Sequence, residues 1–322
     1  MCAARLIFVD DATAPGALDS TPCALVIGNF DGVHRGHQAV IAETVERGSG
    51  EGGRMACALT FDPHPGEVVG AGAPPVLTSL EDRVELMGNL GIGRVYVRRF
   101  DAAFAAWPPE RFARELVAQA LRAKVVVVGQ NFRFGARRGG DLNALREFGA
   151  ALDFDVHVPA VASDLRGAYS STRARDAVAA GDMAEANRVL GRPHAIAGLV
   201  VRGDARGRTI GFPTANIDAV LEMLPKDGVY AVVVDRMPSS GEPPTRLGSG
   251  VANVGVRPTV GGGKRLVEVH LFDFAGDLYG ARLRVHFVSR LRDEKKFSSL
   301  DELKAQIVRD AAAARLALSR AA

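Results

Sequence analysis

Short apolar runs alternate with helical patterns through the first half of the chain, and this rhythm restricts the fold more than any other feature. The runs expected to form strands are residues 24–29, 55–61, 94–98, 124–129 and 154–158. Val125 to Val128 is apolar at every position, which is typical of a strand buried on both faces of a parallel sheet. Strands and helices in this order predict a doubly wound α/β domain with right-handed connections.

Local signals show where the intervening helices begin. Ser79 and Asp141 are candidate N-caps, and Pro108-Pro109 is suited to the first turn of another helix. Asp182, followed by Glu185, caps one more helix that ends near Gly191.

The second half of the chain has a different pattern. Residues 195–202, 228–235, 249–254, 266–272 and 282–289 alternate apolar and polar positions, with glycine, proline and polar turns between them. Ser299 and Glu302 form a capping box before a final helix with an apolar stripe. The pattern predicts a small antiparallel β-barrel or sandwich with a C-terminal helix.

Composition excludes several classes of protein. The 322 residues carry 40 Lys and Arg against 37 Asp and Glu, a balance that does not favour nucleic-acid or membrane partners. The N-terminal apolar run is too short for a signal peptide, and no run approaches a membrane span. Cys2, Cys23 and Cys57 lack C-x-x-C spacing, which favours reduced thiols. We therefore expect a cytoplasmic protein with no nucleic-acid or membrane partner, and a homo-oligomer is left open.

The segment GNFDGVHRGH, residues 28–37, lies between the first predicted strand and the next helix. Its glycines at 28, 32 and 36 allow the backbone to turn tightly and to approach a ligand. His34 and His37 stand where the helix should begin, so both rings and the first backbone N–H groups can face an anion. A lone histidine would more often be an ordinary surface or core residue, but this pair in this turn favours a phosphate site.

Three further polar segments follow predicted strands, where ligands bind in open α/β sheets. They are Asp62-Pro63-His64-Pro65, the run from Gly129 to Gly135, and Ser170-Ser171-Thr172-Arg173-Ala174-Arg175. The hydroxyls and cations of the last segment suit phosphate, although a plain N-cap explains Ser170 to Thr172 equally well. The P-loop pattern G-x-x-x-x-G-K-[ST] does not occur. The residues therefore predict a nucleotide-phosphate site.

GNFDGVHRGH with the downstream SSTRAR resembles the HxGH-type nucleotidyltransferase superfamily. With TFDPHP and NFRFG added, the first half looks like the adenylyltransferase half of bacterial bifunctional riboflavin kinase/FAD synthetases. The resemblance implies direct in-line transfer of AMP from ATP to the phosphate of FMN, without a protein nucleophile and with Mg²⁺ assisting.

The resemblance also implies roles for individual residues. His34 and His37 would be the catalytic groups that hold the triphosphate. The ATP-binding residues would be Gly28, Asn29, Phe30, Asp31, Gly36, Ser170, Ser171, Thr172 and Arg175. The flavin-binding residues would be Asp62, His64, Asn131 and Phe132. Gly66 departs from the family pattern, because an arginine often stands there, and this leaves the number of cations near the acceptor phosphate in question.

In the second half, a glycine- and arginine-rich stretch runs into Phe212-Pro213-Thr214-Ala215-Asn216. If the chain is extended there, Thr214 and Asn216 project to the same side. Their oxygens could bind Mg²⁺, which prefers oxygen ligands, although turn chemistry accounts for these residues as well.

Glu268 stands on a predicted strand whose other face, Val267, Val269 and Leu271, should point into the core. A carboxylate beside apolar neighbours can serve as a general base. The alternative is a surface acid paired with Arg284 or another cation on a neighbouring strand, which composition alone favours.

GRTIGFPTAN, GVANVGVRPT, EVHLFDF and LRDEKKF resemble the riboflavin kinase module, which implies a small antiparallel barrel ending in a helix. By this resemblance Thr214 and Asn216 carry Mg-ATP, and Glu268 takes the proton of the ribityl hydroxyl. Gly203, Arg206, Gly207 and Arg208 would form the loop over the ATP phosphates.

The combined prediction is a bifunctional enzyme that makes FMN from riboflavin and FAD from FMN, with ATP as co-substrate. The adenylyltransferase domain is expected at residues 1–186 and the riboflavin kinase domain at 187–322. Two alternatives stay open: a protein with one active module, and a non-catalytic flavin-binding protein.

Overall fold

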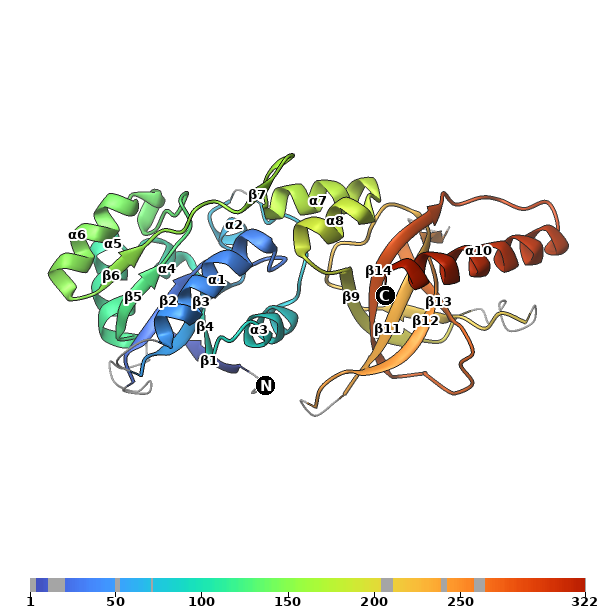
Figure 1. Cartoon of the computed structure of the whole chain (residues 1–322), viewed down its shortest axis with the longest axis horizontal. Helices are drawn as coiled ribbons and strands as arrows, with labels where there is room; N and C mark the ends of the chain where they lie inside the picture. The colour runs from blue at the N-terminus through green and yellow to red at the C-terminus, as the bar shows by residue number, and fades with distance from the viewer. Residues whose placement is uncertain are drawn as a thin grey trace. The chain divides into compact units, whose positions relative to one another are not determined.

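The structure is a computed structural model that describes residues 4–10, 21–49, 53–70, 72–203, 211–238, 242–257 and 264–321. The chain divides into two compact units, Met1–Pro74 with Ser79–Ser170, and Pro75–Thr78 with Ser171–Ala322. Figure 1 shows the elements of both units in chain order. We expected the adenylyltransferase domain to end at residue 186. That boundary stays a prediction, because a division into compact units does not show which residues each activity needs.

The first unit contains a six-stranded parallel sheet with the order β1-β4-β3-β2-β5-β6. Its strands are β1 (Arg5–Val9), β2 (Cys23–Ile27), β3 (Met55–Asp62), β4 (Arg94–Arg99), β5 (Ala123–Val127) and β6 (Asp155–His157). The five predicted strands are present, and the edge strand β1 was not expected. The doubly wound α/β fold is confirmed.

Helices connect these strands and begin at the expected caps. The helices of this unit are α1 (Arg35–Gly48), α2 (Pro65–Val68), α3 (Leu80–Asn89), α4 (Ala102–Ala105), α5 (Pro109–Arg111), the π-helix η1 (Phe112–Ala120), the 3-10 helix η2 (Ala136–Arg138) and α6 (Leu142–Leu152). Ser79 accepts a hydrogen bond from the backbone N–H of Asp82, and Asp141 accepts from Asn143 and Ala144. A short hairpin, β7 (Ser163–Asp164) and β8 (Gly167–Ala168), precedes the end of the unit.

Each face of the sheet packs against its own set of helices. Leu25, Leu59 and Val126 point to one face and pack with apolar residues of η1 and α6. Val26, Ala58 and neighbours point to the other face and pack with α1 and α3. Because both faces are covered, β2 and β5 are largely apolar, and polar side chains gather at the carboxyl ends of the strands.

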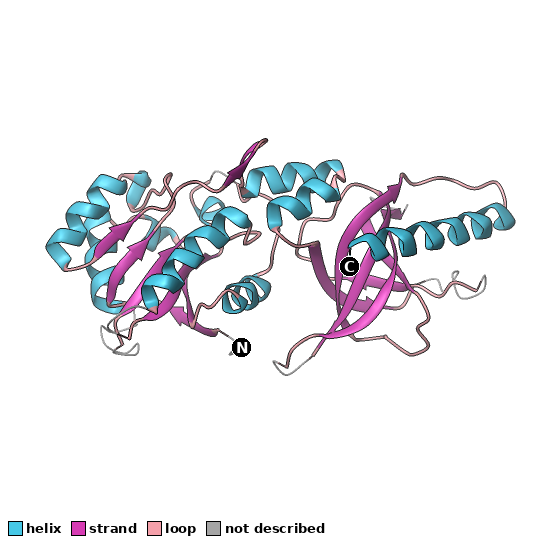
Figure 2. Cartoon of the chain, in the orientation of Figure 1, coloured by secondary structure: helices cyan, strands magenta, loops and turns pink. Residues whose placement is uncertain are grey.

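The second unit begins with α7 (Ser171–Ala180) and α8 (Met183–Leu190) and continues into a closed antiparallel barrel (Figure 2). The barrel order is β10-β13-β12-β11-β14-β9. Its strands are β9 (His194–Val201), β10 (Ala215–Asp218), β11 (Gly228–Met237), β12 (Thr245–Arg257), β13 (Lys264–Leu271) and β14 (Arg282–Arg292). The terminal helix α10 (Leu300–Ala321) packs on the outside, where Ala314 meets Ala231 and Phe272. The barrel with a C-terminal helix is therefore confirmed.

Within the described ranges, no helix combines the length and the apolar character needed to cross a membrane. Cys23 and Cys57 are both buried and neither is in a disulfide, whereas Cys2 lies outside the described residues.

Candidate functional site

The loop between β2 and α1 has an unusual backbone. Phe30 has φ of 52° and Val33 has φ of 37°, although both are non-glycine residues, and Gly32 has φ of 84°. Both Phe30 and Val33 are buried, at 1% exposure each, so packing holds them in this left-handed conformation. Strained positions of this kind gather at functional loops, and this loop carries the first candidate motif.

His34 and His37 lie together at the start of α1. His34 is the N-cap, and its Nδ1 accepts a hydrogen bond from the backbone N–H of His37 at 3.3 Å. The two rings stack with centroids 3.7 Å apart. Because Nδ1 of His34 is an acceptor, the proton of its neutral ring is on Nε2.

The His37 ring is held in its uncharged form. Its Nδ1 is buried and has no hydrogen-bond partner among the described residues. Burial lowers the pKa of His37 well below its usual value, and the nearby His34 and Arg83 lower it further. This ring can therefore offer an N–H donor without a full positive charge.

Gly36 lies where the chain passes close to other groups. A Cβ atom at Gly36 would be 2.8 Å from the carbonyl oxygen of Tyr169 and 2.9 Å from Cε1 of His34. Any larger residue would displace the histidine, which explains a glycine between the two rings.

The turn after β3 reaches the same loop. His64 caps the short helix α2 through its Nδ1, which accepts from the N–H of Gly66 at 3.1 Å. Its Nε2 is 3.2 Å from the side-chain nitrogen of Asn29. Asn29 and His64, predicted separately for ATP and flavin, are thus brought into contact. A Cβ at Gly66 would lie 2.6 Å from the carbonyl oxygen of Gly72, so this backbone does not accommodate the arginine of the family pattern.

Arg83 of α3 lies at the centre of these residues and was not predicted. Its Nη1 donates to the carbonyl oxygen of Asn29 at 2.8 Å and to Oγ1 of Thr60 at 3.3 Å. Its Nη2 is 4.0 Å from the carboxylate of Asp62. A sequence signal existed, because Arg83 is three residues after Leu80 and four before Met87, on the apolar side of an amphipathic helix.

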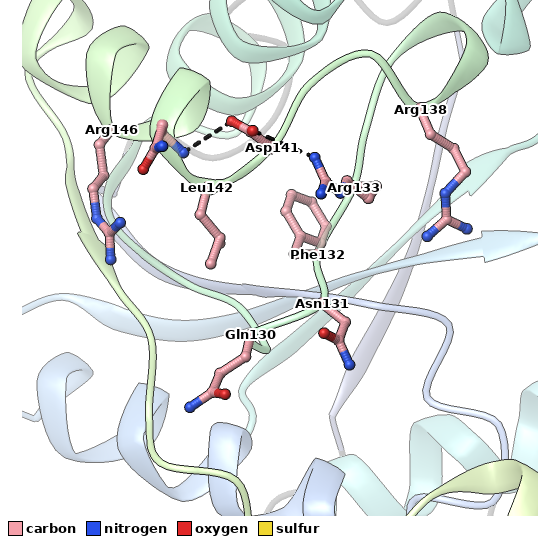
Figure 3. A pocket seen from close by; sticks show the side chains of 9 residues that line it. Gln130, Asn131, Phe132, Arg133, Arg138, Asp141, Leu142 and Arg146 are labelled. Atoms are coloured by element: carbon pink, nitrogen blue, oxygen red, sulfur yellow. Dashed lines mark hydrogen bonds and ion pairs between the residues drawn. The ribbon is translucent and has the colours of Figure 1, made fainter.

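A cavity of about 530 Å³ opens beside the loop after β5. Its lining residues are Gln130, Asn131, Phe132, Arg133, Arg138, Asp141, Leu142, Asn143 and Arg146. Figure 3 shows Arg138 and Arg146 at opposite sides of the cavity, with the ring of Phe132 between them. Arg133 forms an ion pair with Asp141 at 3.4 Å. The pKa of Asp141 is below its usual value, because the carboxylate accepts hydrogen bonds from the backbone N–H groups of Ala144 and Asn143 and lies beside Arg133. The predicted flavin residues Asn131 and Phe132 therefore line a cavity rich in cations.

The last phosphate motif stands at the division between the compact units. Ser170 ends the first unit, and Ser171 begins α7 in the second. Nε of Arg175 donates to the carbonyl oxygen of Pro75 at 2.8 Å, and Arg173 pairs with Glu185 at 2.7 Å. The expected contacts of Ser170, Ser171 and Arg175 with ATP phosphates stay predictions.

In the second unit, Asn216 and Glu268 face each other. Asn216 of β10 is the register partner of Glu268 of β13, so both side chains project to one side of the sheet. Val267 and Val269 are buried at 1% exposure each, as predicted, which leaves Glu268 on the outer face. Arg284, the cation considered as its alternative partner, is on β14, which does not pair with β13.

Asn216 is suited to hold a ligand. It is 8% exposed, and its Oδ1 is buried without a hydrogen-bond partner among the described residues. A Cβ at Gly203 would lie 2.4 Å from Nδ2 of Asn216, so glycine is needed for this close approach. Thr214, two residues earlier, is exposed. The predicted loop residues Arg206, Gly207 and Arg208 lie outside the described residues.

Side chains near Glu268 extend this polar surface. Nδ1 of His270 lies 2.9 Å from the carbonyl oxygen of Pro213, which ties the segment before Thr214 to β13. Asn253 of β12 is the other register partner of Glu268, and its amide donates to Glu294 at 3.4 Å. Sequence reasoning missed Asn253, because only strand pairing places it beside the carboxylate.

In the described part of the chain, no group of three or more His, Cys, Asp or Glu side chains could hold a metal ion.

Comparison with known proteins matches both units. A family model described as FAD synthetase matches residues 17–173, and one described as riboflavin kinase matches residues 190–318. A solved structure titled as a macrolide-efflux protein from Streptococcus pneumoniae is 30% identical, with a TM-score of 0.80, and the match covers 94% of this chain and 97% of that one.

Curated relatives match along almost the whole chain. "Bifunctional riboflavin kinase/FMN adenylyltransferase" of Escherichia coli (strain K12) is 43% identical over 91% of this chain and 92% of its own length. Proteins of the same name from Pseudomonas fluorescens and Bacillus subtilis (strain 168) are 42% and 35% identical, over 91% and 89% of this chain and 92% and 89% of their own lengths. Two modules in the same order, at this identity and coverage, leave one assignment: the chain belongs to the family of bifunctional riboflavin kinase/FMN adenylyltransferases.

Proposed function

We propose that this chain phosphorylates riboflavin with ATP to give FMN, and then transfers AMP from a second ATP to FMN to give FAD and pyrophosphate. The observation that carries the proposal is the match to both modules along one chain, in units that each present a coherent polar site. Loss of the histidine pair, or of Glu268 with Asn216, would have favoured a single activity, and both sets are present.

In the adenylyl transfer, a phosphate oxygen of FMN attacks the α-phosphorus of ATP and the bond to the pyrophosphate oxygen breaks. His34 and His37 would donate hydrogen bonds to the triphosphate as charge builds on the leaving oxygen. The uncharged state of His37 fits this role, because a neutral ring still carries an N–H donor. Asn29 and Asp31, in the same loop, would contact the nucleotide.

FMN would be bound by the cavity after β5. The isoalloxazine ring is planar and aromatic, and the phosphate of FMN is an anion. Phe132 offers an aromatic surface, and the guanidinium groups of Arg133, Arg138 and Arg146 offer positive charge beside it. Asp62 and His64 would stand at the nucleotide end of this acceptor site.

In the kinase reaction, the ribityl hydroxyl attacks the γ-phosphorus of ATP, and ADP leaves. Glu268 would accept the hydroxyl proton, and such a group must stand within hydrogen-bond distance of the attacking oxygen. Asn216 pairs with Glu268 across β10 and β13, so the base and the phosphate-binding residues are next to one another. Gly203, Arg206, Gly207 and Arg208 would form the loop over the phosphates.

Mg²⁺ fits the residues beside Glu268. The buried, unpartnered Oδ1 of Asn216 and the exposed hydroxyl of Thr214 are hard oxygen ligands, which this ion prefers. When bound, Mg²⁺ would neutralise negative charge on the ATP phosphates.

The setting that we propose is the cytoplasm, with riboflavin, FMN and ATP as partners and no nucleic acid or membrane. The near balance of 40 basic and 37 acidic residues supports this, as do Cys23 and Cys57, which are not in a disulfide. The oligomeric state stays open.

A time course tests the function directly. The purified chain is incubated with riboflavin, ATP and Mg²⁺, and the flavins are separated by chromatography. We expect FMN to appear first and FAD to follow. Accumulation of FMN without FAD would contradict the proposed adenylyl transfer. Flavin that stays bound without being converted would favour the non-catalytic alternative.

A further inference from the structure

Arg83 is a buried cation that none of the predicted roles uses. Arg83 is 9% exposed. Removing a guanidinium from water costs free energy unless hydrogen bonds and opposite charges surround it. Burial lowers the pKa of Arg83, while Asp31 and Asp62 act in the opposite direction. A cation retained at such a position needs a reason beyond packing.

The contacts of Arg83 join two segments that are far apart in the sequence. Nη1 donates to the carbonyl oxygen of Asn29, after β2, at 2.8 Å and to Oγ1 of Thr60, in β3, at 3.3 Å. Oγ1 of Thr60 also donates to the Asn29 carbonyl oxygen at 3.1 Å. The strained loop that continues to His37 is therefore anchored at its first residues by one side chain of α3.

The charge of Arg83 acts on the same set of groups. Asp62 is 4.0 Å from its Nη2, and Asp31 interacts with it electrostatically. Two carboxylates would repel an incoming triphosphate, and a positive charge that interacts with both of them offsets that repulsion. Its Nε is buried without a hydrogen-bond partner among the described residues, so one donor of this cation is not used by those parts of the chain.

We propose that Arg83 is a positioning residue for adenylyl transfer, which fixes the loop from Gly28 to His37 against the end of β3 and supplies a buried positive charge beside Asp31, Asp62 and His37. This inference rests on the proposed adenylylation of FMN. Arg83 is not proposed as a catalytic residue, because it acts through Asn29 and its neighbours and does not itself touch the reacting atoms.

Kinetics of two substitutions test it. Arg83→Met removes the donors and the charge, and Arg83→Lys keeps the charge but cannot serve two acceptors in the same way. For FMN to FAD, we expect Arg83→Met to raise the KM for ATP and to lower kcat, with kcat/KM reduced roughly 100-fold. Arg83→Lys should recover part of that loss. Riboflavin kinase activity of the same preparations reports folding of the other unit.

The matched control is Arg114→Met, which removes an exposed ion pair of η1 with Glu110. It should leave FAD formation unchanged. Nuclear magnetic resonance titration of His37 gives a second reading, because burial lowers the pKa of this ring most and the charges of His34 and Arg83 lower it further. Since Arg83 lowers the pKa of His37, the pKa should rise in Arg83→Met and stay low in Arg83→Lys; His34 is the other titratable group that lowers it.

Wild-type FAD formation in Arg83→Met would overturn the inference, and so would equal losses in both variants with no change in the titration of His37. If Arg83→Met does not fold, unchanged KM and kcat in Arg83→Lys overturn it. Failure of the wild-type chain to form any FAD would instead contradict the proposed function.

Discussion

Asn216 and Glu268 are register partners on the neighbouring antiparallel strands β10 and β13. Directly opposite residues on one face have Cβ atoms about 5 Å apart, so the candidate metal ligand and the candidate base belong to one site. The histidine pair belongs to a different compact unit. The two activities can therefore be tested separately within one chain.

Glu268→Gln should abolish most FMN formation. The amide keeps the shape of the side chain but cannot accept the hydroxyl proton, and loss of a general base costs roughly 100-fold or more in rate. The measurement is conversion of riboflavin to FMN, with conversion of supplied FMN to FAD as the internal control. A parallel fall of both activities would refute the two-site description.

Asn216→Ala should raise the concentration of Mg²⁺ needed for the kinase reaction. The substitution removes the buried Oδ1 that has no partner among the described residues, and we expect the half-saturating concentration to rise about tenfold or more. The check is a Mg²⁺ titration of riboflavin phosphorylation, with the same titration of FAD formation as control. An unchanged requirement would exclude Asn216 as a ligand.

His37→Ala should have the reverse pattern to Glu268→Gln. It removes one donor to the triphosphate, and FAD formation should fall roughly 100-fold while FMN formation continues. His157→Ala is the matched control, because this histidine on β6 belongs to the same unit and has no predicted role. Normal FAD formation by His37→Ala would remove the histidine pair from the proposed mechanism.

Acid should destabilise the barrel through Asp235. Nε2 of His286 hydrogen-bonds Asp235 at 2.7 Å, and this contact, with Arg246, lowers the pKa of the carboxyl. A carboxyl with a lowered pKa contributes stability above its unfolded pKa, near 4, and loses it as the pH falls through the folded value. Asp235→Asn should therefore lose about 1–2 kcal/mol at pH 7 and respond less to acid.

Urea unfolding followed by circular dichroism at several pH values measures this effect. The control is Asp273→Asn, whose pair with Arg315 has both side chains more than half exposed and should contribute little. If the free energy of unfolding depends on pH in the same way in the wild-type and Asp235→Asn chains, the contact between Asp235 and His286 does not contribute this stability.

Much of the fold could be predicted because its signals are local. Ser79, Asp141 and Asp182 cap helices where expected, and Val125 to Val127 form part of a central strand. The edge strand β1 was missed. Its sequence, Arg-Leu-Ile-Phe-Val, is apolar at four of five positions, but β1 pairs with β4 at the edge of the sheet and leaves Phe8 66% exposed, so its burial does not follow from its composition.

The motifs of the candidate sites could be predicted from the sequence, but the contacts between residues of distant segments could not. The sequence by itself determined which residues are candidates for the chemistry, since a histidine pair at a helix start or an oxygen pair in an extended segment is defined by neighbours along the chain. Only the tertiary structure decided that Arg83 joins Asn29 to Thr60, and that Asn253 stands beside Glu268. The physical reason is that strand order, register and burial depend on packing between distant segments, which the local periodicity of hydrophobic residues does not encode.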